Sequence, residues 1–340
     1  MRGILILTAL VSAALSAPPA RAADSAGQIV TVYSDRHQVE DKALFDVFTK
    51  ETGIRVDLVD DDFDPLLERL QHEGSKSPAD LLISAGEATL ARTAEAGLFR
   101  PLPALPSLPP EFRDPAGNWI GLSYWARVIV YHKDRADPAQ LRNYEDLSDP
   151  QLHGRIVVRS AGSPYNAALV ASMIVADGTE DTETWARGLV ANFARPPQGG
   201  DGSQLEAISA GEGDVTVVNT RYWSRFAASD KVTEQEVVAD LGLIFPNQDN
   251  RGTQIDLIGA GILKTAPHLS AASSLLAFLL RPDVQEKFAA ANFEFPILPG
   301  VSPAPVLKAL GPFKIDKAAI GKLGRFTPEA QDVMAKSGWE

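Results

Sequence analysis

A few tyrosine, histidine and arginine residues stand out in this chain of 340 residues because they follow predicted strands. His37 follows IVTVYS, Tyr165 follows SAGSP, and Tyr222 follows VVNTR. Alone, such a histidine is more often a surface residue and each tyrosine a packing aromatic, and the spacing contains no compact metal motif. Two phenols and one imidazole that converge, however, form a hard donor set suited to a trivalent metal, which would convert the phenols to phenolates.

A second group of residues has the chemistry to bind an anion. In RSAGSPY, Ser163 is the predicted N-cap of a helix that has Pro164 in its first turn. The backbone N–H groups of Ala161 to Ser163 would then point at whatever lies above them. The predicted anion site consists of Arg159, Ser160, Gly162, Ser163 and Arg221, with Arg36 as a further cation near the metal candidates.

Enzymatic chemistry is not predicted. The sequence has no G-x-S-x-G nucleophile elbow and no G-x-x-x-x-G-K-[ST] phosphate loop, and its five histidines suggest no triad. The acidic run Asp60 to Asp62 lacks the ligand spacing of a calcium loop, so a solvated strand end is the better interpretation.

The elements that carry these residues alternate between strand and helix, which predicts an α/β fold with parallel strands. Ligands of such sheets bind at the carboxyl ends of the strands, here around Ser34–His37, Asp60–Asp62 and Ser84–Glu87. A second alternating group places Ser160–Tyr165 and Asn219–Tyr222 in equivalent positions. The predicted strands are 29–34, 54–60, 79–84, 126–132, 154–160 and 214–220, and the predicted helices are 39–53, 64–74, 165–176, 182–193 and 203–210.

The length and this repetition favour two lobes with a cleft between them. We expect residues 28–124 and 253–300 to form a discontinuous N-terminal lobe and 125–252 to form the C-terminal lobe. Residues 301–340 are expected to form a helical tail packed on the lobes. The extended runs 123–132 and 253–264 would be the crossings between the lobes.

The chain begins with a predicted signal peptide, residues 1–22, in which Arg2 precedes an apolar run and small residues end the segment. No cysteine occurs, so disulfides, thiolate ligands and lipid attachment at cysteine are excluded. Loss of Arg2 and Arg21 with the signal changes the formal charge from −12 to −14, which disfavours nucleic acid and anionic membranes as partners. We expect a periplasmic monomer whose mature chain does not insert into the membrane.

Many ordered segments resemble the periplasmic ferric-ion-binding proteins of bacterial iron ABC transporters, which have the type II periplasmic-binding-protein fold. The resemblance rests on VYSDRH, GLSYWARVIVY, YEDLSDPQLHGRI, GEGDVTVVNTRYW and NFEFPILPGV, among others. It implies that His37, Tyr165 and Tyr222 bind Fe³⁺ together with carbonate, phosphate or citrate. It also implies an inner-membrane ABC permease as the partner that receives the iron.

The sequence departs from the family at several positions. Gln38 replaces a frequent tyrosine, Arg221 stands at the first tyrosine of the N-T-Y-Y motif, and Trp125 replaces a frequent arginine. Glu87 lies two residues beyond Ala85, the position at which some members have a glutamate. We hypothesise that Arg221 takes over anion binding, because a guanidinium pairs in a bidentate way with carboxylate or phosphate oxygens.

Two alternatives remain open at the level of sequence. The protein could be a receptor for a small organic anion, such as a phosphonate or carboxylate, gripped by Arg36, Arg159 and Arg221 with no metal. Alternatively, the iron could arrive already chelated by citrate or a small siderophore, without direct bonding to tyrosine.

Overall fold

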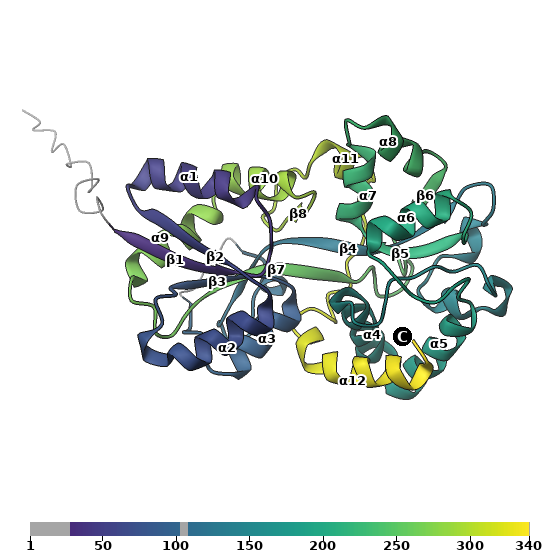
Figure 1. Cartoon of the computed structure of the whole chain (residues 1–340), viewed down its shortest axis with the longest axis horizontal. Helices are drawn as coiled ribbons and strands as arrows, with labels where there is room; N and C mark the ends of the chain where they lie inside the picture. The colour runs from purple at the N-terminus through teal and green to yellow at the C-terminus, as the bar shows by residue number, and fades with distance from the viewer. Residues whose placement is uncertain (1–27, 103–107, 340) are drawn as a thin grey trace, which may run out of the picture.

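The strands of the computed structural model, which describes residues 28–102 and 108–339, form one sheet that runs through both ends of the molecule (Figure 1). The sheet has the order β2-β1-β3-β7-β4-β5, and β6 and β8 pair with β4. The strands are β1 (Ile29–Ser34), β2 (Arg55–Asp60), β3 (Leu81–Ala85), β4 (Ile120–His132), β5 (Val215–Asn219), β6 (Leu241–Ile244), β7 (Ile255–Ile262) and β8 (Phe295–Pro296). The predicted signal peptide lies outside the described residues.

The N-terminal lobe is built on three parallel strands, since β1 pairs with both β2 and β3 in parallel. The apolar runs that predicted these strands are buried in β1 and β3, whereas β2 is a more exposed edge strand. Helices cover both faces: α1 and α10 lie on one, and α2 and α3 lie on the other (Figure 1). The helices of this lobe are α1 (Asp41–Thr52), α2 (Phe63–Glu73), α3 (Glu87–Glu95), α9 (Leu269–Leu279) and α10 (Pro282–Ala291).

Two strands connect the lobes. The first part of β4, residues 120–126, pairs antiparallel with β7. Its second part, residues 127–132, pairs with β5 and β6. Because β7 also pairs with β3, β4 and β7 join the two lobes through continuous backbone hydrogen bonding.

The C-terminal lobe surrounds β4, β5 and β6 with helices α4 (Pro164–Asp177), α5 (Thr179–Ala191), α6 (Asp201–Ser209), α7 (Thr220–Ala227) and α8 (Val232–Ala239). The strand predicted over 154–160 is wrong, because only Ile156 makes bridges, to Phe193 and Val215. Beyond it the chain turns toward α4, where the Asn166 side chain donates to the carbonyl oxygens of Arg159 and Ser160. Five short 3₁₀ helices complete the described chain: Gly74–Lys76, Pro110–Phe112, Pro138–Gln140, Glu145–Ser148 and Pro150–Leu152.

The last segment carries α11 (Pro305–Lys308) and α12 (Leu323–Ser337). Helix α12 contacts α3 of the N-terminal lobe and both α4 and α5 of the C-terminal lobe, so it spans the two lobes (Figure 1). At the α3 contact, a Cβ added to Gly324 would lie only 2.3 Å from the Cβ of Ala91. Only glycine therefore allows this close approach without a shift of one helix.

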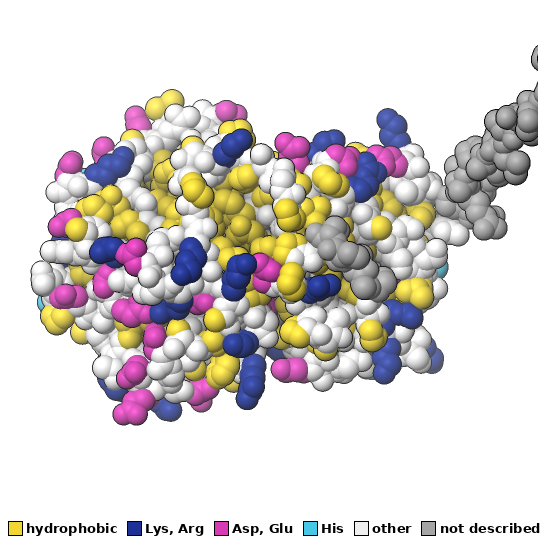
Figure 2. Space-filling view, turned by 180° about the vertical axis from the view of Figure 1, so that it is seen from behind, with side chains coloured by type: hydrophobic (Ala, Val, Ile, Leu, Met, Phe, Trp, Pro, Cys, Tyr) yellow, Lys and Arg dark blue, Asp and Glu magenta, His cyan; other side chains and the backbone are white. Residues whose placement is uncertain are grey.

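Aromatic side chains line the region where the crossing strands meet the tail. Tyr124 of β4 stacks between Phe112 and Phe295, and Phe313 of the tail contacts both Phe295 and Phe245. On the face opposite to that in Figure 1, hydrophobic side chains gather across the middle of the molecule (Figure 2). Among the described residues, no helix combines the length and apolar character that a membrane crossing would need.

Candidate functional site

A cleft of about 540 Å³ lies between the two lobes. Loops after β1, β2 and β3 line one wall, the start of α4 lines the facing wall, and α12 contributes Thr327 and Gln331. Of the residues predicted from sequence, those that line the cleft are His37, Gly162, Ser163 and Tyr165. The fold therefore brings His37, which follows β1, and Tyr165, in the first turn of α4, to one cavity.

His37 occupies the N-terminal wall in an unusual backbone conformation, with a φ of 51°. Its N–H donates to Asp60 Oδ1 at 3.2 Å, while its Nδ1 lies 3.1 Å from Asp60 Oδ2 and its Nε2 lies 3.2 Å from Asp62 Oδ1. Desolvation acts to lower the pKa of His37, but the hydrogen bonds and charges of the two aspartates outweigh it and raise the pKa. The side chain is 51% exposed, so the ring is accessible to a ligand.

The two phenols, Tyr165 and Tyr222, form a pair on the C-terminal side. Tyr165 lies in the first turn of α4 and Tyr222 lies in the first turn of α7. The two phenols are close enough for Tyr222 to act on the pKa of Tyr165. Burial, followed by the neighbouring Tyr222, raises the pKa of Tyr165, and the Arg221 charge opposes this rise. Tyr165 is thus protonated in the protein alone, and a metal would have to displace its proton to bind it.

Arg221 lies beside this pair, and its positive charge acts on the buried Glu294 without direct contact. Its guanidinium carbon is 5.3 Å from the centre of the Tyr222 ring and 5.4 Å from that of the Trp125 ring. Within the described residues, no hydrogen bond or ion pair of its side chain is found, so its five donors remain available to an anion. Trp125 is buried, and its ring edge meets Tyr165 at 5.5 Å between centres.

The turn from Ser160 to Ser163 leads into α4 as predicted, with Ser163 at the N-cap and Pro164 at the first helical position. The N–H of Ser163 is not free, because it donates to the carbonyl oxygen of Ser160 at 3.1 Å. The N–H groups of Ala161 and Gly162 have no protein acceptor in the described part of the chain. The buried Oγ of Ser163 also has no hydrogen-bond partner there. These groups remain available to a ligand.

The other predicted arginines are already engaged by acidic side chains. Arg36 is buried; its Nε donates to Asp41 Oδ2 at 2.7 Å, and its Nη2 lies 3.4 Å from Glu294 Oε1. Arg159 donates to Asp201 Oδ1 at 3.0 Å and stacks on the Tyr165 ring. In a receptor that grips its ligand through three arginines, these two would first have to leave their carboxylates.

Two further predicted residues turn away from the cleft. The side-chain amide of Gln38 donates to the carbonyl oxygen of Arg36 at 2.7 Å. Glu87 is buried under α12, where its Oε1 accepts the N–H of Leu323. Burial, with the nearby Asp256, raises the pKa of Glu87 to about 8 despite hydrogen bonds from the backbone of residues 321–323, at the start of α12.

Some residues that build the site have no distinctive signal in the sequence. Asp35 ties the His37 loop to β3 by accepting from Ser84 Oγ and from the Ala85 N–H, both at 2.7 Å. Asp201 and Asn166 brace the loop that carries Arg159. Their only local hints are that Asp35 precedes Arg36-His37 and that Asn166 follows Tyr165.

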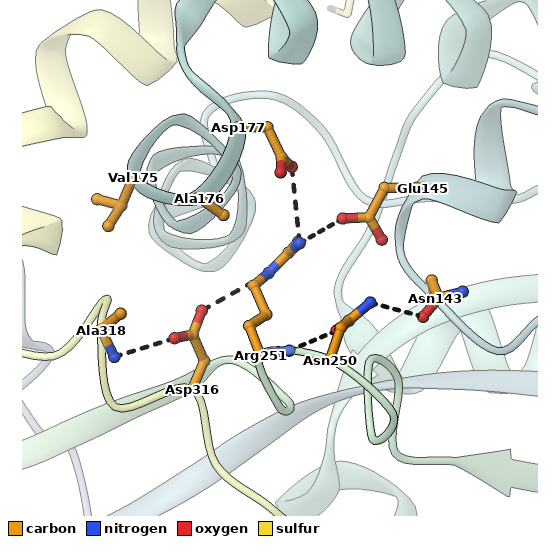
Figure 3. Close-up of a pocket in the computed structure, with 9 residues that line it drawn as sticks. All are labelled: Asn143, Glu145, Val175, Ala176, Asp177, Asn250, Arg251, Asp316 and Ala318. Carbon is orange, nitrogen blue, oxygen red and sulfur yellow. Dashed lines mark hydrogen bonds and ion pairs between the residues drawn. The ribbon is translucent and has the colours of Figure 1, made fainter.

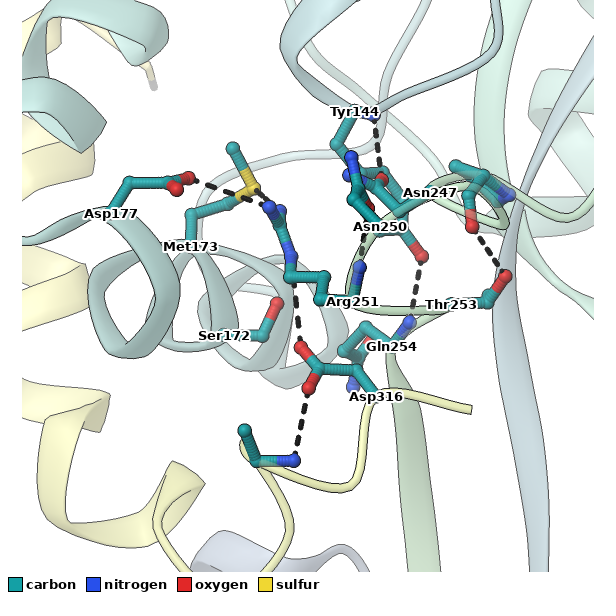
Figure 4. Close-up of polar contacts among 12 residues, drawn as sticks. Tyr144, Ser172, Met173, Asp177, Asn247, Asn250, Arg251, Thr253, Gln254 and Asp316 are labelled. Carbon is teal, nitrogen blue, oxygen red and sulfur yellow. Dashed lines mark hydrogen bonds and ion pairs between the residues drawn. The ribbon is translucent and has the colours of Figure 1, made fainter. Parts of the chain in front are cut away.

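Another pocket, of about 600 Å³, lies away from these residues and surrounds Arg251 (Figure 3). Arg251 forms ion pairs with Glu145, Asp177 and Asp316 (Figure 3) and contacts Met173 (Figure 4). It therefore ties the segment before β7 to the end of α4 and to the tail. The carboxylates around this pocket are already paired with the Arg251 guanidinium, so we interpret the pocket as structural.

A metal in the cleft would need ligands other than acids and histidine alone. Among residues 28–102 and 108–339, no group of three or more His, Cys, Asp or Glu side chains could hold a metal ion. Tyr165, which lines the same cleft as His37, offers a phenol oxygen as a further donor.

Comparisons with known proteins agree with this architecture. A family model described as bacterial extracellular solute-binding protein matches residues 76–312. The chain is 41% identical to iron uptake protein A1 of Synechocystis sp. over 342 residues, covering 99% of this chain and 95% of that protein. The solved structure of Trichodesmium FutA (IdiA) in complex with iron and citrate matches with a TM-score of 0.88 and 40% identity, covering 92% of this chain and 100% of that chain. For the ferric binding protein of Campylobacter jejuni the TM-score is 0.86 and the identity 35%, covering 92% and 100%.

The chain belongs to the family of bacterial extracellular solute-binding proteins. The predicted two-lobed α/β fold of type II periplasmic binding proteins is confirmed by the structural matches. The resemblance to periplasmic ferric-ion-binding proteins is confirmed by the names and the coverage of these relatives.

Proposed function

We propose that this protein is a periplasmic carrier that captures ferric iron with a synergistic anion and delivers it to an inner-membrane ABC permease. Its task would be binding and release rather than catalysis, and it would act as a monomer after removal of residues 1–22. Its relatives include an iron uptake protein and a structure that contains iron and citrate. The formal charge of −12 for the whole chain disfavours nucleic acid as a partner.

The single observation that carries this proposal is that Tyr165 lines the wall of the cleft opposite His37 and has a second phenol, Tyr222, close beside it. The three side chains come from different lobes, so the complete ligand set would form only when the lobes close around the metal. Closure would exclude water, which strengthens the attraction between Fe³⁺ and the phenolates. Opening would separate the ligands again and release the iron.

For the anion, the proposed donors are Arg221, Ser163 Oγ and the backbone around Ser160 and Gly162, with Arg159 nearby. The unpaired guanidinium of Arg221 supports this assignment, because a bare Fe³⁺ next to a fixed cation would be repelled. An anion between the two would convert that repulsion into attraction. Citrate, carbonate and phosphate all supply the required oxygens.

One alternative retains support from the structure: iron that enters as a chelate. A chelate carries its own carboxylates, which the free donors of Arg221 could bind without tyrosine coordination. A metal-free receptor for a phosphonate or carboxylate is less well supported, because Arg36 and Arg159 already bind Asp41, Glu294 and Asp201.

A visible absorption titration of the purified apo protein with ferric citrate tests the proposal. Coordination by phenolate predicts a broad charge-transfer band that is lost in Tyr165→Phe and in Tyr222→Phe. Tyr131→Phe, a change in β4 of the same lobe, serves as the control and should keep the band. A colourless titration of the wild-type protein would exclude tyrosine coordination and favour the chelate.

A further inference from the structure

The buried carboxylate of Asp201 is linked through its hydrogen bonds to the segments that carry both tyrosines. Asp201 is the first residue of α6 and is fully buried. Its Oδ2 accepts from Arg127 Nη1 and from the Asn219 N–H, both at 2.8 Å, and its Oδ1 accepts from Arg159 Nη1 at 3.0 Å. Residues from three separate segments of the C-terminal lobe therefore donate hydrogen bonds to one carboxylate.

Two of these contacts lead directly to Tyr165. Arg159 places its guanidinium carbon 4.9 Å from the centre of the Tyr165 ring. Arg127 Nη2 donates to Asn166 Oδ1 at 2.9 Å, and Asn166 is the next residue after Tyr165. The Asn166 amide in turn donates to the carbonyl oxygens of Arg159 and Ser160, both at 3.0 Å. The loop and the first turn of α4 are thus held from two directions.

The third contact leads to Tyr222. Asn219 is the N-cap residue of α7, whose first turn carries Arg221 and Tyr222. Its N–H is held by Asp201, and its side-chain oxygen accepts from Arg127 Nη1 at 3.1 Å. The same carboxylate therefore fixes the starts of both helices that carry the phenols.

The charges make this arrangement sensitive to the loss of Asp201. Arg127 is only 2% exposed and the Arg159 side chain 18% exposed. Removing the shared negative charge would leave two guanidinium groups close together and unpaired in a poorly hydrated region, which is strongly unfavourable. The guanidinium on the Tyr165 ring would then be free to move, and the ring with it.

We propose that Asp201 is a positioning residue of the iron site, which sets the relative placement of Tyr165 and Tyr222 without touching the metal. The inference rests on the proposed function, since it requires that both phenols bind iron. It extends that function by assigning a role to a residue outside the ligand set. Productive metal geometry tolerates errors of only about 0.5 Å, so small shifts of either phenol would be measurable.

The test compares Asp201→Asn with Asp214→Asn. Asp214 is a matched control because it also accepts from two arginines of this lobe, from Arg135 Nε at 2.7 Å and from Arg155 Nε at 2.8 Å. Both ferric-loaded variants and the wild-type protein are compared by their charge-transfer band and by iron affinity in competition with citrate. We expect Asp201→Asn to move the band and to weaken iron binding about tenfold or more, and Asp214→Asn to leave both within about twofold.

Thermal unfolding of the apo proteins separates positioning from general damage. Similar losses of Tm in the two variants, with a changed band only in Asp201→Asn, support the inference. An unchanged band and affinity in Asp201→Asn overturns it, as does an equal loss of affinity in both variants. A wild-type protein that shows no band overturns the proposed function and this inference together, whereas a wild-type band that persists in Asp201→Asn overturns the inference alone.

A milder pair of variants covers the case in which Asp201→Asn does not fold. Arg159→Gln removes the charge that lies on the Tyr165 ring, and Arg159→Lys keeps a charge but loses the planar fork. We expect Arg159→Gln to move the band in the same direction as Asp201→Asn and Arg159→Lys to restore part of the wild-type value. If Arg159→Gln leaves both the band and the affinity unchanged, Asp201 does not act through Tyr165.

Discussion

Glu87 Oε1 accepts the backbone N–H of Leu323 at 2.9 Å, so the first turn of the C-terminal helix ends on a buried side chain of the N-terminal lobe. The rest of α12 packs on α4 and α5 of the other lobe. A movement that separates the lobes must therefore change this contact or carry α12 with one lobe. A second buried acid, Asp256, lies near this contact. Its negative charge raises the pKa of Glu87.

The stability of the protein should decrease as the pH rises toward 8, because of Glu87. Its pKa rises from 4.5 in the unfolded chain to about 8 in the fold, so between these values only the folded state holds the proton. The expected slope is up to about 1.4 kcal/mol of unfolding free energy per pH unit. Asp256, with a pKa raised by burial to about 6, contributes mainly below that pH.

Urea unfolding at pH 6 and pH 8 measures this slope. Glu87→Gln should lose most of the difference in unfolding free energy between the two pH values, because an amide does not titrate. Glu95→Gln, at the exposed end of the same helix, should retain it. An identical pH dependence in Glu87→Gln and the wild-type protein would show that Glu87 is ionised in the fold.

Arg221→Ala should change how iron binding depends on the anion. With the guanidinium present, we expect iron affinity to rise with added carbonate or citrate, because the anion lies between two positive charges. In the alanine variant this dependence should be largely lost. Isothermal titration with and without each anion provides the measurement, and an unchanged anion dependence would disprove the assignment of Arg221.

His37→Ala should weaken iron binding about tenfold or more while leaving the charge-transfer band in place, because the band arises from the phenolates. The contribution of His37 should disappear as the pH falls through its raised pKa, since a proton then occupies the ring. His268→Ala is the control: His268 also contacts an aspartate, Asp80, at 3.1 Å, but does not line the cleft. Equal effects of the two substitutions would argue against a ligand role for His37.

Gly324→Ala should destabilise the protein by about 1–3 kcal/mol, because the new methyl group overlaps Ala91 of α3. The double variant Gly324→Ala with Ala91→Gly removes the overlap and should recover part of the loss, less about 1 kcal/mol for glycine inside a helix. Denaturant unfolding of the three proteins gives the comparison. A single substitution that costs nothing would mean that α12 can move away from α3 freely.

Local pattern predicted much of the first lobe. The run IVTVYS coincides with β1, and the helices predicted over 39–53 and 64–74 agree with α1 and α2 within two residues at each end. Each of these elements buries an apolar face. Its apolar residues therefore recur with the period of a strand or a helix, and this period can be read from a short stretch of sequence. The predicted strand over 154–160 is wrong because its backbone bonds to separate segments instead of one partner strand: the Val157 N–H donates to Val215, whereas the Val158 carbonyl oxygen accepts from Gln198.

The side-chain partners could not be predicted in the same way. Arg36 stands next to His37 in the sequence, yet its guanidinium is held by Glu294, which lies 258 positions along the chain. Asp201 was absent from the predicted site because an aspartate at the start of a helix is an ordinary feature of sequences. Its importance arises from the convergence of three segments, which is a property of the tertiary structure alone.

The pairing of β3 with β7 also constrains how the chain reaches its structure. A chain that emerges with its N-terminus first presents β1, β2 and β3 early, but the strand that covers the open edge of β3 arrives more than half a chain later. Helix α12, which completes the packing of both lobes, is the last element of all. The N-terminal lobe is not a contiguous piece of chain, so its sheet cannot be completed before β7 has been made. Until these two late segments are available, the edge of β3 and the surfaces that α12 covers on α3, α4 and α5 stay exposed.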